Sequence, residues 1–197
     1  MRKRRLILEA TIEILANQGI EEITFESLGD KLQTTKANIR YHFQDKDELI
    51  FLAVKFMAFT AQSVTATMVE NAQKPQDKLN GVILGAYRHL KTNPSHVRAF
   101  MMYFYYASIF SNYRELFTQS RMIGQLRLSK ILHDLPRRDG QASVKSLMLL
   151  ADQIQNLITG QIFGVVLLGG SFSTSTAQTQ NMVKALLAGE GINWQVS

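Results

Sequence analysis

The chain has 197 residues, of which 46% are hydrophobic and 19% are charged, a composition that allows a packed core and excludes a disordered polymer. It contains no cysteine, so disulfides, thiolate metal sites and cysteine nucleophiles are excluded. The formal net charge is +6, but residues 1–55 hold nine Lys and Arg against nine Asp and Glu. Net charge therefore gives no support to a nucleic-acid-binding head. Only local clusters of basic residues could give it, because phosphate contacts depend on neighbouring charges on one face.

The sequence predicts a soluble, cytoplasmic protein. Its basic start is followed by Glu9 and Glu13, which interrupt the apolar region that a secretory signal needs. The most apolar run is expected at residues 157–170, and it is shorter than the roughly 20 residues that span a bilayer.

Four helices are expected in the first third of the chain. Apolar residues recur at helical spacing over residues 3–17, and Gly19 is a good C-terminal stop. Thr24 offers an N-cap for a short second helix, and Thr35 offers one for a third. Asp45 is placed to cap a long fourth helix that begins near residue 46.

The remaining residues also indicate helices. One starts with Pro75 near its first position, and Asn93 before Pro94 marks the start of the next. Three more are expected over about 112–134, 142–168 and 175–188, with a polar loop at 136–141. Because no strand pattern or internal repeat competes, the predicted fold class is all-α. We expect a three-helix head over residues 1–48 and a larger helical body over residues 49–197.

The second and third helices have the spacing of a helix-turn-helix unit, in which one helix crosses the DNA backbone and the other lies in the major groove. Apolar side chains would hold the two helices together, namely Leu28, Leu32, Ile39 and Phe43. The exposed positions of the third helix would carry Thr35, Lys36, Asn38, Arg40 and His42. These residue types suit phosphate and base-edge contacts. The alternative is an ordinary solvated helical face, and periodicity alone does not decide between the two.

The stretch "ILEATIEILANQGIEEITFESLGDKLQTTKANIRYHFQDKDELI", at residues 7–50, resembles the tetracycline-repressor (TetR) family of transcriptional regulators. The most specific part is the "YHF…K…L" ending formed by Tyr41, His42, Phe43, Lys46 and Leu49. The resemblance implies that the third helix reads DNA and that Lys46 contacts a phosphate from a helix N-terminus.

The DNA-contacting set predicted from the residue types and the resemblance is Thr24, Thr35, Lys36, Ala37, Asn38, Arg40, Tyr41, His42 and Lys46. Two positions depart from the family pattern. Gln33 stands where the family usually has glycine, and a left-handed backbone there would cost roughly 1–2 kcal/mol. Arg40 stands where the family often has tyrosine, so the target sequence cannot be carried over.

A helix-turn-helix protein that reads a palindrome needs a two-fold dimer. The last two helices are the best candidates for the interface, as they are in the family, because they carry broad apolar faces and two glycines spaced four apart. The predicted interface set is Ile154, Leu157, Ile158, Gly160, Ile162, Gly164, Met182 and Leu186. Ordinary intrachain core is the competing interpretation for some of these residues.

Residues 99–117 are rich in aromatic side chains and methionine, which suits either plain core or a pocket for an apolar, planar or amphiphilic effector. The resemblance favours a small-molecule effector. The predicted lining set is Phe56, Phe59, Tyr87, Met101, Phe104, Tyr105, Phe110 and Gln153.

The sequence thus predicts a ligand-responsive homodimer that binds a palindromic operator on double-stranded DNA, most simply a repressor released by its effector. An enzyme is disfavoured, because the four histidines are scattered without metal-ligand spacing and no nucleophile or phosphate-cradling motif is present. No cofactor, metal or membrane partner is expected. The alternative is a helical sensor or adaptor protein that no longer binds DNA.

Overall fold

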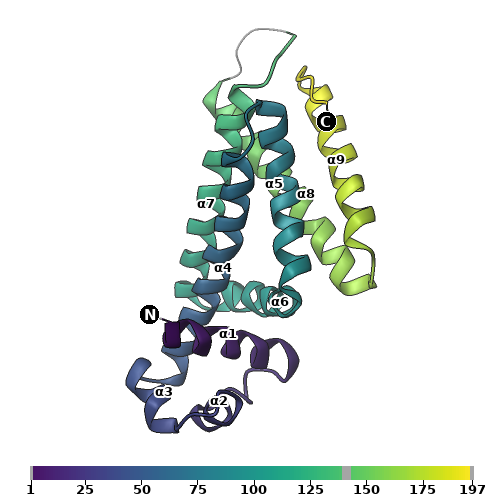
Figure 1. Cartoon of the computed structure of the whole chain (residues 1–197). Coiled ribbons are helices and arrows are strands. Elements are labelled where there is room, and N and C mark those ends of the chain that lie inside the picture. Colours follow the sequence, from purple (N-terminus) through teal and green to yellow (C-terminus); the bar gives the residue numbers. More distant parts are fainter. Residues whose placement is uncertain (1, 139–142, 196–197) are drawn as a thin grey trace. The chain divides into compact units, whose positions relative to one another are not determined.

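The computed structural model describes residues 2–138 and 143–195, which form nine helices (Figure 1). Within these ranges, the only extended pairing is an isolated bridge between Arg137 and Ile192, so the all-α prediction is confirmed. The helices are α1 (Arg2–Asn17), α2 (Phe25–Lys31), α3 (Lys36–His42), α4 (Lys46–Glu70), α5 (Pro75–Thr92), α6 (Pro94–Ile109), α7 (Ser111–His133), α8 (Val144–Leu168) and α9 (Phe172–Gly189).

The helices pack into two compact units. Unit 1 comprises Met1–Thr60 and Asn93–Phe117, and unit 2 comprises Ala61–Thr92 and Thr118–Ser197. Helices α4 and α7 each run through the boundary, so each contributes residues to both units. This packing does not follow the predicted division at residues 48 and 49, because the first half of α4 and all of α6 pack with the N-terminal helices. The division at residue 48 stays a prediction about function.

The predicted helix starts are confirmed where local capping sets them. The Thr24 side chain accepts a hydrogen bond from the Ser27 amide at 2.9 Å, and Ser27 caps the Thr24 amide in return. Asp45 accepts from the Glu48 amide at 2.8 Å at the start of α4. Such bonds satisfy amides that have no partner in the first turn of a helix, so residues within four positions decide where it begins.

Three predicted boundaries differ from the structure or fall on residues outside the described ranges. Helix α9 begins at Phe172 rather than near 175, with Ser171 at its N-cap. The start expected at residue 142 lies outside the described residues, and α8 begins at Val144 after the cap Ser143. The polar loop predicted at 136–141 is described only up to residue 138.

Unit 1 has its own core. The core draws on α1, α2, α3, the first half of α4, α6 and the start of α7. Its largest members with less than 2% of their surface exposed include Ile7, Leu28, Ile39, Phe43 and Leu49. The apolar face predicted to hold the helix-turn-helix together is therefore confirmed for Leu28, Ile39 and Phe43, while Leu32 is only partly buried.

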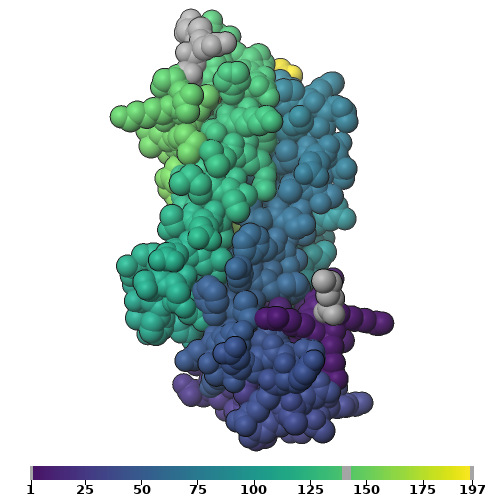
Figure 2. All heavy atoms as spheres, turned by 90° about the vertical axis from the view of Figure 1, so that its left-hand side faces the viewer, coloured from purple at the N-terminus to yellow at the C-terminus, as the bar shows by residue number. Residues whose placement is uncertain are grey.

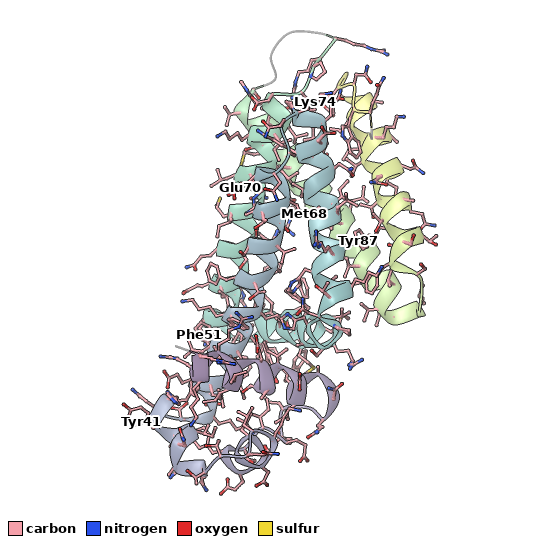
Figure 3. All side chains as sticks on the ribbon, viewed as in Figure 1. Tyr41, Phe51, Met68, Glu70, Lys74 and Tyr87 are labelled. Atoms are coloured by element: carbon pink, nitrogen blue, oxygen red, sulfur yellow. The ribbon has the colours of Figure 1, made fainter. Side chains whose placement is uncertain are left out.

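Unit 2 is a bundle of α5, the second half of α4, most of α7, α8 and α9. Close approach of α5 to α4 depends on glycine, since a Cβ at Gly85 would lie 2.8 Å from the Thr65 Cα. Trp194 closes the end of the bundle, with its indole N–H donating to the Gln76 carbonyl at 3.0 Å. Figure 3 shows Tyr87 on α5, beside α9.

Helix α4 is, among the described helices, the one long and apolar enough to cross a membrane by length and composition. From the sequence, the most apolar run is expected at residues 157–170, so α4 was not considered as a possible membrane span. In unit 1 this helix supplies the fully buried residues Leu49, Ala53, Val54 and Met57 to the core. Core packing against neighbouring helices accounts for the apolar residues in this part of the helix.

Candidate DNA-binding site

Two short capped helices and a three-residue turn form the candidate site. Helix α2 ends with Lys31, and α3 begins at Lys36 after its N-cap Thr35. The Thr35 hydroxyl accepts from the Asn38 amide at 3.2 Å, as the sequence predicted for an N-cap. The short connection leaves little freedom in the angle between the helices, so the exposed face of α3 is held in a defined direction.

The turn uses two special backbone positions. Gln33 has a φ of 50°, which confirms the left-handed conformation expected where the family usually has glycine. Gly29 permits the close approach of the turn, because a Cβ there would lie 2.8 Å from the Thr34 carbonyl oxygen. The Thr34 amide donates to the Gly29 carbonyl at 2.8 Å. The sequence analysis missed Gly29, although a glycine within a seven-residue helix was a usable signal.

The outer face of α3 is polar and aromatic. Tyr41 is 85% exposed, an unusual state for a tyrosine, and Figure 3 shows it pointing away from the unit 1 helices. Its ring meets the His42 ring edge to face, with centroids 5.2 Å apart. Buried Ile39 and Phe43 lie on the opposite side of the helix. Thr24, Thr35, Lys36, Ala37 and Arg40 are exposed as well, and Asn38, His42 and Lys46 are half-buried.

Neighbouring side chains hold two of the predicted contact residues. The Lys36 ammonium pairs with the Glu26 carboxylate from α2. The hydrogen bond from Lys36 lowers the pKa of Glu26 below its usual value. The Arg40 guanidinium lies over the Phe25 ring, 5.6 Å from its centroid. Neither partner was predicted from the sequence, because each lies ten or more positions from the residue that it contacts, outside any local pattern.

More positive charge lies at the start of α1. Arg4 lies over the Phe43 ring at 5.1 Å from the centroid, and Arg5 donates to the Glu9 carboxylate at 2.8 Å. Both arginines are exposed. Neither belongs to the predicted DNA-contacting set, although the contact with Phe43 places Arg4 beside the end of α3.

Lys46 opens α4, two positions before Glu48. Asp45 and Glu48 cap the backbone there, with Glu48 accepting from the Gln44 amide at 2.7 Å. No carboxylate pairs with Lys46 in the part of the chain that the structure describes. A lysine at a helix N-terminus without an acidic partner can donate to a phosphate.

The predicted effector residues are divided between the two units. Phe56, Phe59, Met101, Phe104, Tyr105 and Phe110 belong to unit 1, whereas Tyr87 and Gln153 belong to unit 2. Tyr105 and Phe110 are 58% and 48% exposed, while Tyr87 is 4% exposed and its hydroxyl is bonded to Ser175 and Thr179. Their role in effector binding stays a prediction.

The predicted interface residues lie on α8 and α9 of unit 2. Ile154 and Ile158 are buried within the chain, so they belong to the intrachain core that was the competing interpretation. Gly160 and Gly164 have open space where a side chain would stand. Met182 of the predicted set is exposed, and so are Leu149, Leu167 and Leu168, which the prediction did not include.

A helix-turn-helix that presents an exposed tyrosine, lysine and arginine on its second helix defines the class of the protein, a DNA-binding transcriptional regulator. Residues 7–53 match the family model described as bacterial regulatory proteins, tetR family. Residues 7–53 of the chain are thus a tetR-family N-terminal domain.

More distant likenesses extend over nearly the whole chain. The chain is 21% identical over 170 residues to the nucleoid occlusion factor SlmA of Yersinia pseudotuberculosis serotype O:1b (strain IP 31758), covering 81% of each protein. A TetR transcription regulator from Haloarcula marismortui ATCC 43049 has a TM-score of 0.78 at 14% identity and covers 98% of this chain and 99% of its own. A candidate transcriptional regulator from Saccharomonospora viridis in complex with choline has a TM-score of 0.74 at 16% identity and covers 98% of both chains. At these identities the solved structures establish the fold alone.

Proposed function

We propose that the chain is a cytoplasmic, homodimeric repressor that binds a palindromic operator and is released from it by a small-molecule effector. The observation that carries the proposal is the outer face of α3, where Tyr41 is 85% exposed beside exposed Lys36 and Arg40. Exposing an aromatic ring of this size to water does not stabilise the isolated protein. A nucleic-acid backbone and base edges, in contrast, offer contacts to all three side chains.

The homodimer is proposed to form through α8 and α9. Leu149, Leu167 and Leu168 are more than 60% exposed, and a second copy would remove this apolar surface from water. Gly160 and Gly164 face open space and would let a partner helix approach closely. Two recognition helices about 34–36 Å apart would then match successive major grooves.

The effector would act through the two helices that belong to both units. Helix α4 carries Lys46 at its start in unit 1 and continues into unit 2, and α7 also crosses the boundary. A ligand that binds one arrangement of these helices more tightly shifts the protein toward that arrangement, and only by its difference in affinity for the two states. Release follows if the favoured arrangement places the two α3 helices at a spacing that no longer fits the operator.

Selection of the purified protein against a randomised double-stranded DNA library tests the proposal, with a variant carrying Arg40→Ala and Lys46→Ala as the comparison. We expect the parent to enrich a palindrome and the variant to enrich none. Binding should weaken steeply as salt rises, because each phosphate contact releases counterions. A folded dimer that enriches no sequence at any salt concentration would instead support the alternative function, a helical sensor or adaptor that does not bind DNA.

A further inference from the structure

A group of polar side chains lies among the helices of unit 2, where apolar packing would be expected. The cluster consists of Gln62 on α4, Ser120 and Arg127 on α7, and Gln155 on α8, all of them half-buried. We call it the buried polar cluster because two of its polar atoms are fully buried. Ser120, Gly124 and Arg127 are spaced by four and three positions, so they share one face of α7. On the face of the molecule shown in Figure 2, atoms of α7 lie beside atoms of α4.

Hydrogen bonds fix the orientation of the two glutamine side chains. Arg127 donates from Nη1 to Gln62 Oε1 at 2.9 Å, and Gln62 Nε2 donates to the Ser120 carbonyl at 3.0 Å. Gln155 Nε2 donates to the Arg121 carbonyl at 3.2 Å. Both the oxygen and the nitrogen of the Gln62 amide therefore have hydrogen-bond partners. The Gln155 amide uses its nitrogen, and its oxygen remains a possible acceptor.

The two amides converge over Gly124. A Cβ at that position would lie 2.0 Å from Gln155 Nε2 and 3.9 Å from Gln62 Nε2. Any side chain at Gly124 would therefore displace Gln155. The glycine makes room for polar atoms from three helices to meet at one place.

Two atoms of the cluster are buried without a hydrogen-bond partner among the described residues, namely Ser120 Oγ and Gln155 Oε1. A buried polar atom without a hydrogen bond destabilises the folded state, so folded proteins rarely keep such atoms without a reason. The carbonyl oxygen of Gln155 can only accept a hydrogen bond, whereas the Ser120 hydroxyl can donate and accept. Both needs would be met by a ligand hydroxyl.

Arg127 adds a positive charge that no carboxylate pairs with in the described parts of the chain. The Arg127 side chain is half-buried, and this burial lowers the pKa of the guanidinium. The negative charge of Glu70 acts in the opposite direction. Its neighbour Arg121 is different, because Arg121 forms an ion pair with Asp152. A partly desolvated guanidinium with free N–H groups is suited to a carboxylate, which it can hold with two parallel hydrogen bonds.

We propose that the buried polar cluster binds the polar end of the effector and that the effector is a small 2-hydroxycarboxylate. Its carboxylate would bind Arg127, and its hydroxyl would donate to Gln155 Oε1 and accept from Ser120 Oγ. This inference rests on the proposed effector response. A quaternary ammonium ligand, such as the choline in the Saccharomonospora viridis structure, is disfavoured here because Arg127 would repel its positive charge.

The test uses the purified protein and three probes: glycolate, lactate and mandelate. Each is compared with its own amide, which keeps the hydroxyl but lacks the negative charge. Calorimetry without DNA should show saturable binding of at least one acid, with its amide at least tenfold weaker. Arg127→Gln should abolish this binding. Arg138→Gln, which removes the same charge from an exposed position, should leave it unchanged.

A second variant guards against misfolding. Ser120→Ala removes a buried hydroxyl that has no hydrogen-bond partner from the protein, so its unliganded melting temperature should stay the same or rise. Its affinity for the bound acid should nevertheless fall at least tenfold. If the cluster served only the fold, Ser120→Ala would lower the melting temperature and leave the affinity for the acid unchanged.

Two outcomes overturn the inference: binding of none of the three acids, or equal binding by the parent and Arg127→Gln. Neither outcome touches the proposed function, because operator selection is carried out without any acid. If the operator is found and none of the acids binds, the proposed ligand class is wrong, while the proposal of a DNA-binding regulator is retained. If an acid binds through Arg127 and no operator is enriched, the ligand site stands and the DNA-binding proposal fails.

Discussion

Replacing Tyr87 with phenylalanine separates a structural role from an effector-binding role for this residue. Its hydroxyl lies 2.7 Å from Thr179 Oγ1 and 2.9 Å from Ser175 Oγ, both on α9. Thr179 already donates its own hydrogen to the Ser175 carbonyl at 2.9 Å. Tyr87 must therefore donate to Thr179, and Ser175 is left to donate to Tyr87. Both hydrogen bonds join α5 to α9.

The size of the effect follows from this geometry. Tyr87→Phe keeps the buried ring and removes two hydrogen bonds, each worth about 1 kcal/mol, so the free energy of unfolding should fall by about 1–2 kcal/mol. For a chain of this length, that loss lowers the melting temperature by roughly 2–8 °C. The Ser175 hydroxyl has only one other acceptor nearby, the Gln161 carbonyl at 3.5 Å, so little of the loss is recovered.

Thermal and urea unfolding of the parent and the variant provide the assay. Tyr105→Phe is the matched control, because Tyr105 is 58% exposed and its substitution should change stability by less than about 0.5 kcal/mol. Equal stability of the parent and Tyr87→Phe would refute the reasoning. Equal stability together with a weakened effector response would place Tyr87 in the effector site, as its sequence context first suggested.

Three further outcomes are expected. Glu26→Gln frees Lys36 for a phosphate, so binding of the selected operator in fluorescence anisotropy should tighten and its log–log salt slope should steepen by about one; an unchanged slope would mean that Lys36 does not reach DNA. Gly29→Ala forces a Cβ to within 2.8 Å of the Thr34 carbonyl and should lower both the melting temperature and operator affinity, whereas full retention of both would contradict the close approach. Burial raises the pKa of Tyr113 to about 12, so the folded state holds this proton more tightly than the unfolded state and stability should decline as pH rises from about 10 to 12. Urea titrations at each pH should find that decline reduced in Tyr113→Phe.

The sequence by itself determined the helices of the head and the start of the helix that follows it. Thr24, Thr35 and Asp45 begin their helices with hydrogen bonds that reach only three residues along the chain. The left-handed position at Gln33 was expected from the family resemblance, because glycine is usual at that place in the turn. Hydrogen bonds within one helical turn do not depend on the rest of the fold, so local sequence suffices to predict them.

The tertiary structure alone decided which side chains meet across helices. The contact between Tyr87 and Thr179 joins positions 92 apart, and the contact between Gln62 and Arg127 joins positions 65 apart. Sequence periodicity said which face of a helix is apolar, but it could not say which other helix that face would meet. For the same reason Tyr87 was predicted to line an effector pocket, and the buried polar cluster was not predicted at all. Packing chooses among the many pairings that similar amphipathic faces allow, and that choice depends on the shapes of all the helices together.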